Sequence, residues 1–588
     1  MTQGLSASSK VDPELSRPSA AGSSSAAGSS SADSIDVIVQ FTSESARSAH
    51  HELALRHGAR LNRTLNLIRA DHYTVSRADL EELANNPDVA HIYPDRQLQA
   101  ATSSSTTDSS TTVNTIDYSW MSLLGLTWPQ SKPAYDGSGI GIAIIDSGMD
   151  ISQDFSNFFI FSRIVYSQSF VPGDSSTTDK YGHGTHVAGI AGGNGQNSNG
   201  FLDTYDIRGL ASNIHFINLR VLDANGAGND SSVIAAIQRA IALKFWYNIR
   251  VINLSLGRPV TTSYLNDPLC QAVQQAWQAG IVVVVAAGNN GRDNSSGTNG
   301  YGTISAPGNS PYAITVGAMN TNGTLTRSDD KMTTYSSKGP TLFDHLVKPD
   351  LVAPGNRILS VRAVGSTLDQ QYPQNIVSKS LYSLLPGFFS SYFELSGTSM
   401  AAPTVSGTAA LLLQQNPNLT PDQIKARLMK TASKEFPASY CPSGKTCPTD
   451  ASQITTAIDP QTGLTYTSYY DMFTVGAGYL DSAAALSSQD VAPAGAKSLS
   501  PTVTYDPATG AVSLVNPTSV IWGTSPVWGT GIIWGTDVLS GSSVIWGTNL
   551  IWGSAAPQAE GIIWGTGIIW GTSTTNAEAI QLLFNGEN

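Results

Sequence analysis

Ser399 is the residue whose setting points most directly to chemistry. It stands in L-S-G-T-S-M-A-A-P (residues 395–403), which runs into the apolar stretch T-V-S-G-T-A-A-L-L-L. A serine among small residues at the start of a helix exposes its hydroxyl beside unpaired backbone N–H groups, and Pro403 is tolerated in a first helical turn. We interpret Ser399 as a nucleophile, although without partners the stretch is equally typical of a buried helix with a capping serine.

Two other motifs contain residue types that activate a serine. Asp146 ends an apolar run in I-I-D-S-G-M-D, where a carboxylate can orient and charge-stabilise an imidazole. His183, in Y-G-H-G-T-H-V-A-G, precedes a helical run and can act as a general base. His186 lies on the apolar part of this run, and we interpret it as structural because the motif offers no carboxylate or thiolate for a metal pair. By itself, Asp146 is also typical of a strand-end turn.

Asn289 completes this set of polar residues. It follows another apolar run, in V-V-V-V-A-A-G-N-N-G, and its carboxamide N–H is a candidate donor to the oxyanion that forms when a nucleophile attacks a carbonyl. Taken alone, the stretch is equally a Gly-Asn-Asn-Gly turn. The case for catalysis therefore depends on whether the chain brings these motifs together.

The elements that must position these residues indicate an α/β fold. Short, near-continuous apolar runs alternate with helical segments, which is typical of a mostly parallel sheet flanked by helices. Ligand sites in such sheets lie beyond the carboxyl ends of the strands, where Asp146 and Asn289 fall. The predicted strands are Ile140–Ile145, Ile214–Val221, Val251–Leu254 and Ile281–Ala286, and the predicted helices are Thr185–Ala191, Ser231–Leu243 and Pro268–Ala279.

Together the motifs resemble the signature blocks of the subtilisin-like serine proteases. D-S-G, H-G-T-H-V-A-G, A-A-G-N and G-T-S-M-A-A-P follow the family's order of Asp, His and Ser, and the resemblance covers residues 116–486. It implies a serine-type endopeptidase that works through an acyl-enzyme intermediate. The roles it implies are nucleophile for Ser399, general base and then acid for His183, orienting partner for Asp146, and oxyanion donor for Asn289 beside the Ser399 N–H.

The resemblance also implies a cleft that binds protein or peptide substrates as an added strand. One wall comes from N-L-S-L-G and the facing wall from V-L-D-A-N-G-A-G. The implied substrate-binding residues are Ser255, Leu256 and Gly257 on the first wall and Gly226 and Gly228 on the second.

Calcium is the cofactor that the resemblance suggests, because family members often bind it for structural reasons. Asp154 in S-Q-D-F resembles one of the family's ligands. The oxygen-rich loop N-G-Q-N-S-N-G at residues 194–200 either completes a calcium site or forms a solvated turn.

The N-terminal part, residues 35–99, is predicted to be a small α+β domain with strands Ile35–Phe41 and His91–Leu98. D-V-I-V-Q-F and V-A-H-I-Y-P-D-R resemble the inhibitory propeptides of these proteases, which leave their C-terminal strand in the cleft. The chain is therefore expected to be a zymogen inhibited by its own propeptide, with cleavage in the polar linker of residues 100–115. The alternative is an unrelated α+β domain.

Amino-acid composition predicts the boundaries of the remaining domains and linkers. Residues 1–34 are rich in Ser, Ala and Gly and are predicted to be a disordered tail. The predicted catalytic domain spans residues 116–488, followed by a linker (489–519), Trp-Gly-Thr repeats (520–572) and a tail (573–588). Two segments lengthen the catalytic domain relative to the family: Val361–Phe393, expected to border the cleft, and Lys434–Phe473.

Charge and cysteine content narrow the function further. Only 13% of the 588 residues are charged and the net charge is −12, which argues against nucleic acid as a partner because phosphate binding requires clustered Lys and Arg. No apolar run approaches the roughly 18–20 residues of a membrane span. Cys441 and Cys447 form either a small disulfide loop or two free thiols, with Cys270 left over. The resemblance implies a secreted or cell-surface protein, yet the N-terminus shows no basic-then-apolar export signal.

A C-terminal repeat falls outside the resemblance. Its W-G-T or W-G-S units recur at six or twelve residues, at Trp522, Trp528, Trp534, Trp546, Trp552, Trp564 and Trp570. A short fixed period predicts an array whose units stack on each other, or an aromatic ladder that contacts a cell surface or carbohydrate. The sequence thus predicts a secreted serine endopeptidase made as a zymogen. The alternative is a surface-binding or adhesion protein whose repeats carry the function and whose protease domain serves maturation.

Overall fold

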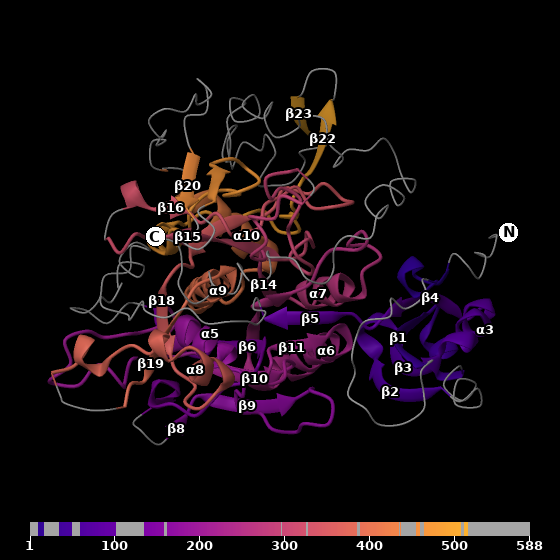
Figure 1. Ribbon diagram of the computed structural model, residues 1–588, viewed down its shortest axis with the longest axis horizontal. Helices are drawn as coiled ribbons and strands as arrows, with labels where there is room; N and C mark the ends of the chain where they lie inside the picture. Colours follow the sequence, from indigo (N-terminus) through magenta and orange to yellow (C-terminus); the bar gives the residue numbers. More distant parts are fainter. Residues whose placement is uncertain are drawn as a thin grey trace.

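One strand of the N-terminal domain, β5 (Gln97–Ala100), runs into the larger domain of the computed structural model (Figure 1). The structure describes residues 10–16, 34–49, 59–100, 135–157, 161–295, 297–324, 327–384, 389–433, 436, 454–458, 464–506 and 511–515. The Trp-Gly-Thr repeats, Cys441 and Cys447 lie outside these residues, as does the predicted cleavage linker apart from Ala100, which belongs to β5.

The larger domain is built on an eight-stranded sheet in the order β16-β15-β14-β12-β6-β10-β9, with β17 also pairing with β15. All of its pairings are parallel except that of β15 with β16. The strands are β6 (Gly141–Asp146), β9 (Ile164–Ser169), β10 (His215–Arg220), β12 (Ile249–Leu254), β14 (Val282–Ala286), β15 (Ile314–Asn320), β16 (Lys331–Met332) and β17 (Leu351–Pro354).

Helices cover both sides of this sheet. Figure 1 shows α5 and α9 on one side of the central strands and α6 and α7 on the other. The helices are α5 (His183–Gly192), α6 (Asp230–Tyr247), α7 (Pro268–Gln278), α8 (Thr367–Gln371), α9 (Thr398–Gln415), α10 (Pro421–Thr431) and α11 (Ser482–Ser487). The predicted α/β class is confirmed, and each predicted strand and helix of the sheet is present with ends shifted by a few residues.

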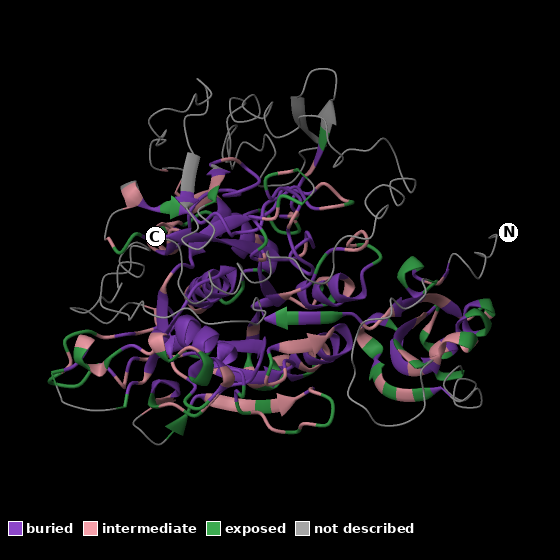
Figure 2. Ribbon diagram, in the orientation of Figure 1, coloured by how far each residue is buried: buried purple, intermediate pink, exposed green. Residues whose placement is uncertain are grey.

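The central strands are apolar because both of their faces are covered. Every residue of β6, β14 and β15 is buried, as Figure 2 shows in purple. The start of α7 is set by the sequence. Asp267 caps the helix by accepting from Leu269 N and Cys270 N, and Pro268 occupies the first turn. The apolar runs therefore fix where each strand stops, and so which polar residue lies at the sheet edge.

The N-terminal domain has a four-stranded antiparallel sheet in the order β2-β3-β1-β4. Its elements are β1 (Ser34–Phe41), β2 (Arg60–Leu65), β3 (Ala70–Ser76), α3 (Leu80–Asn85) and β4 (Val89–Pro94). The predicted single strand His91–Leu98 is wrong in one respect: the chain leaves this sheet after β4, and β5 pairs with the catalytic domain instead. The break at residues 95 and 96 follows from contacts with that domain, which local alternation does not encode.

The predicted disordered tail of residues 1–34 also needs correction. Val11 bridges to Ile92 of β4, and Leu15 is buried in the core of the N-terminal domain. The segment Lys10–Ser16 is therefore packed on the domain, because it contains an apolar residue and charged residues that find distant partners.

Four further regions complete the larger domain. In the insertion 361–393, β18 (Ile358–Val361) pairs with β19 (Tyr392–Leu395), and α8 lies between them in the chain. The second insertion includes the hairpin β20 (Ile454–Ile458) and β21 (Thr465–Tyr469). The predicted linker 489–519 is wrong in part, because Ser498 is buried against α10 and the hairpin β22 (Thr502–Asp506) and β23 (Ala511–Val515) follows it. The short pair β7 (Ser156–Asn157) and β8 (Phe161–Ser162) lies ahead of β9.

Candidate active site

Two of the candidate residues meet where β6 ends and α5 begins. His183 Nδ1 lies 2.8 Å from Asp146 Oδ1, and both side chains are completely buried. Asp146 Oδ1 also accepts the backbone N–H of Ser147 at 2.7 Å. With the carboxylate as acceptor, the imidazole carries its proton on Nδ1, which leaves Nε2 as the basic nitrogen.

The electrostatics of this pair favour the charged imidazolium. Burial by itself lowers the pKa of His183, but the charge of Asp146 and its hydrogen bond outweigh burial, so the pKa is raised above its usual 6.5. His183 Nε2 is buried and has no hydrogen-bond partner among the described residues. A basic nitrogen held this way can accept a proton from a hydroxyl that comes within hydrogen-bond reach.

A second carboxylate, which the sequence reasoning missed, holds the pair in place. Asp179 is buried and accepts the backbone N–H groups of Gly182 and Thr185 and the hydroxyl of Ser147, each at 2.7 Å. It thus caps the first turn of α5 and ties it to the end of β6. The available signal was an aspartate four residues ahead of His183, at the start of a helix.

Ser399 lies at the second position of α9, after Gly397, whose φ of 150° is available to glycine and strained for other residues. Its Oγ donates to the carbonyl of Ser255 at 3.1 Å, and the hydroxyl of Ser255 donates to the carbonyl of Ser399 at 2.8 Å. The start of α9 is therefore fixed to the chain segment that leads into β13 (Leu256–Gly257). The backbone N–H groups in the first turn of α9 have no acceptor four residues earlier in the helix.

Asn289 lies beside the same helix start. Its Oδ1 accepts both the backbone N–H and the hydroxyl of Thr398, each at 3.0 Å. With the oxygen anchored, the carboxamide nitrogen is the free end of the side chain, since no described residue pairs with it. Thr398, which the motif analysis did not single out, thus orients Asn289.

The two predicted walls of the cleft both pair with β5. β11 (Ala227–Asn229) and β13 flank it antiparallel, with Gly228 opposite Leu98 and Gly257 opposite Gln99. The Gly226 carbonyl accepts the Ala100 N–H at 2.8 Å. A Cβ on Gly226 would lie 2.6 Å from the Tyr181 ring at a φ of 74°, so only glycine fits this turn.

β5 shows the alternation of a half-buried strand. Leu98 and Ala100 are buried and Gln97 and Gln99 are exposed, a pattern visible as purple and green along β5 in Figure 2. The chain's own N-terminal domain therefore fills the groove that the sequence assigned to substrate.

The insertion 361–393 lies against the segments of chain that lead into His183 and β11. Thr367 N donates to Lys180 O, Leu368 N donates to Tyr181 O, and the Thr367 hydroxyl donates to Ala224 O. These contacts lie just ahead of His183 and β11, which bears out the expectation that the insertion borders the cleft.

His186 is structural, as the motif suggested. Its Nε2 lies 3.1 Å from the carbonyl of Ile358 and 3.0 Å from that of Phe393. Burial, together with the nearby His183, lowers the pKa of His186 to about 3, so the ring is neutral and holds β18 and β19 against α5.

Asp154, the predicted calcium ligand, is hydrogen-bonded to protein donors through both of its carboxylate oxygens. Its Oδ1 accepts Asn197 N at 2.8 Å and its Oδ2 accepts the Tyr392 hydroxyl at 2.9 Å. The buried Arg163 donates to the Asp154 carbonyl. Burial raises the pKa of Asp154 to about 6. Among the residues that the structure describes, no cluster of three or more His, Cys, Asp or Glu side chains could hold a metal ion.

A buried Asp–His pair, a helix-start serine and an anchored carboxamide are the groups that a serine hydrolase uses. The structure joins Asp146 to His183 and Asn289 to the start of α9, but Ser399 Oγ donates to Ser255 rather than to His183 Nε2. A model of the subtilase family matches residues 137–458, more than half of the chain. The chain therefore belongs to the subtilase family, a family of serine-type endopeptidases.

Several relatives resemble the chain in sequence. It is 36% identical over 307 residues to serine protease AprX of Bacillus subtilis (strain 168), covering 51% of this chain and 62% of AprX. It is 33% identical over 300 residues to subtilisin DY of Bacillus licheniformis, covering 51% of this chain and 85% of that protein. It is 31% identical over 382 residues to subtilisin E of Bacillus subtilis (strain 168), covering 64% and 78%.

One solved structure has the same fold. Fervidolysin from Fervidobacterium pennivorans aligns with a TM-score of 0.52 at 20% identity, over 77% of this chain and 61% of fervidolysin. At this identity the likeness concerns the fold alone.

Proposed function

We propose that the chain is a secreted serine endopeptidase, made as a zymogen whose N-terminal domain inhibits it. The observation that carries the proposal is β5, which lies between β11 and β13 as an extended peptide would. Strand addition satisfies the backbone groups of any peptide, so protein and peptide chains are the proposed substrates. Leu98, which is completely buried, marks the side chain that contributes most to recognition.

The proposed reaction uses Ser399, His183, Asp146 and Asn289 in the order that acyl transfer requires. Ser399 Oγ gives its proton to His183 Nε2 as it bonds to the scissile carbonyl carbon, and Asp146 stabilises the imidazolium. The developing oxyanion accepts from Asn289 Nδ2 and the Ser399 backbone N–H. The imidazolium then protonates the leaving amine. Water, deprotonated by the same imidazole, hydrolyses the acyl-enzyme and regenerates the Ser399 hydroxyl.

The register of β5 leads to a specific maturation bond. Leu256 pairs with Ala100, and Ser255, which accepts the Ser399 hydroxyl, directly precedes Leu256. A peptide that continued past Ala100 in this antiparallel register would bring its next residue opposite Ser255, and we take that next residue as the one before the scissile bond. Ala101 lies outside the described residues, so the assignment rests on this register. We infer that the enzyme cuts its own chain between Ala101 and Thr102.

Labelling with a fluorophosphonate tests the peptidase proposal. The matured wild-type enzyme should hydrolyse casein and carry the label on Ser399, and Ser399→Ala should do neither. A matched control is Ser378→Ala, an exposed serine whose hydroxyl lies 2.8 Å from that of Ser380. Label on another residue, or casein hydrolysis by Ser399→Ala, would contradict the assignment.

Secretion is proposed from the family resemblance, and no helix of the described residues is long and apolar enough to cross a membrane. The surface-binding alternative depends on the Trp-Gly-Thr repeats, which lie outside the described residues. Calcium at Asp154 forms no part of the proposal, because donors already occupy that carboxylate.

A further inference from the structure

The segment Lys10–Ser16 lies against the point where the inhibitory strand leaves the N-terminal domain. Its backbone is anchored by Asp12 N, which donates to Ile92 O at 2.9 Å, and by the buried Leu15. Lys10 Nζ donates to Asn86 O at 2.9 Å. These contacts place two acidic side chains of the segment beside Arg96.

Arg96 makes ion pairs with both acidic residues. Its Nη2 lies 2.6 Å from Asp12 Oδ2 and its Nε lies 3.0 Å from Glu14 Oε2. The side chains of Arg96 and Asp12 are 6% and 10% exposed, whereas that of Glu14 is half exposed. The pair with Asp12 is therefore the one shielded from water, and a buried cation depends on such a partner.

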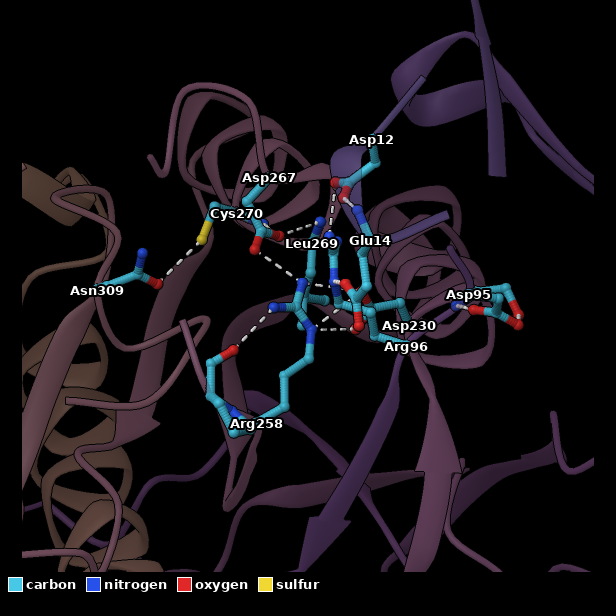
Figure 3. Close-up of polar contacts among 12 residues, drawn as sticks. Asp12, Glu14, Asp95, Arg96, Asp230, Arg258, Asp267, Leu269, Cys270 and Asn309 are labelled. Carbon is cyan, nitrogen blue, oxygen red and sulfur yellow. Dashed lines mark hydrogen bonds and ion pairs between the residues drawn. The ribbon is translucent and has the colours of Figure 1, made fainter. Parts of the chain in front are cut away.

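Arg96 is also part of the contact with the catalytic domain. It directly precedes β5, and its carbonyl accepts the Asp230 N–H at the start of α6 at 2.9 Å. Figure 3 shows its side chain close to Arg258, which pairs with Asp230 and Asp267 at 2.8 and 2.7 Å. The two carboxylates of the catalytic domain nearest to Arg96 are thus already engaged by Arg258.

The charges around Arg96 follow from this layout. Burial and the neighbouring Arg258 both act to lower the pKa of Arg96, and Asp12, Asp267 and Asp230 more than offset them, so the pKa is raised. Without Asp12 and Glu14, none of the described carboxylates would pair directly with Arg96. The buried guanidinium would then be more stable in water, which it reaches only when β5 leaves the cleft.

We propose that Lys10–Ser16 is an acidic clasp that docks on Arg96 and retains the inhibitory strand Gln97–Ala100 in the cleft after the chain is cut. This inference rests on the proposed zymogen function. The clasp acts mainly in the inhibited complex because an ion pair exposed to water contributes little, whereas a buried charge that loses its partner is strongly destabilised. Residues 17–33 connect the clasp to β1, so the clasp can be removed without cutting the sheet of the N-terminal domain.

The test compares release of the propeptide in full-length variants. Cleavage of the chain is followed on gels, and active enzyme is followed by fluorophosphonate labelling, so that the delay between the two measures retention. Asp12→Asn combined with Glu14→Gln should shorten this delay at least about ten-fold, since it leaves a buried cation unpaired. An unchanged cleavage rate shows that the variant folds.

Two further variants make the result specific. Asp79→Asn with Glu81→Gln removes the same charge from a half-buried and an exposed position at the start of α3 and should leave the delay unchanged. In an Arg96→Gln background, the clasp variant should have no additional effect.

A delay within two-fold of wild type in the clasp variant, or an equal effect of the α3 variant, would overturn the clasp. A wild-type chain that never cuts itself and never takes up the label would instead refute the proposed function, so the two failures are distinguishable.

Discussion

Leu98→Ala should weaken retention of the inhibitory strand about 50-fold. Leu98 is 0% exposed and packs in the main core of the catalytic domain. The substitution removes three buried carbon atoms, and at about 0.8 kcal/mol for each the loss is about 2.4 kcal/mol. Since 1.4 kcal/mol corresponds to a factor of ten, propeptide release should be about 50-fold faster. A residual cavity would increase this value.

The assay uses the full-length chain and separates cutting from release. Gels give the rate of cleavage, and hydrolysis of a fluorogenic peptide gives the rate at which free enzyme appears afterwards. Gln99→Ala is the matched control, because Gln99 is exposed and pairs with Ala227 and Gly257 through its backbone. Release at the wild-type rate in Leu98→Ala, or an equal acceleration in Gln99→Ala, would refute the strand-in-cleft account.

Three other predictions follow from the site. The midpoint of the rising limb of kcat/KM should lie above pH 6.5, because catalysis needs neutral His183 and the pKa of His183 is raised. Asp146→Asn should move that limb to lower pH and greatly reduce the rate. A limb that does not move would contradict the pairing of Asp146 with His183. Asn289→Ala should lower kcat about 10²–10³-fold, a magnitude established for a related subtilisin, with little change in KM; a change in KM alone would exclude an oxyanion role. Tyr392→Phe should destabilise the protein by about 1–3 kcal/mol in thermal unfolding, because Asp154 loses a buried hydrogen-bond donor. A chelator should leave the thermal unfolding curve of the wild type unchanged. A large shift of that curve with chelator would show that a cation binds at Asp154.

The sequence predicts well what depends on local pattern. Continuous apolar runs predict β6 and β14, because a strand buried on both faces has no polar alternation. The residues after those runs, Asp146 and Asn289, then lie at the sheet edge by geometry alone. The helix start at Ser399 follows from small residues and Pro403, so the site could be assembled from motif order before any coordinates.

What could not be predicted depends on distant partners. Lys10–Ser16 resembles disordered chain until Arg96, more than eighty residues away, is placed beside it. The Tyr392 hydroxyl donates to the Asp154 carboxylate, although the two residues are 238 positions apart in the sequence. One usable signal was present: K-V-D-P-E-L-S combines charges, proline and leucine within a tail otherwise rich in Ser, Ala and Gly.

The N-terminal sequence of the processed enzyme is the measurement that tests the central claim most directly. Purified full-length wild type, incubated without any added protease, should yield a mature chain that begins at Thr102, while Ser399→Ala should remain intact. A mature chain beginning elsewhere would contradict the register of β5 in the cleft, and processing of Ser399→Ala would contradict self-cleavage by this site.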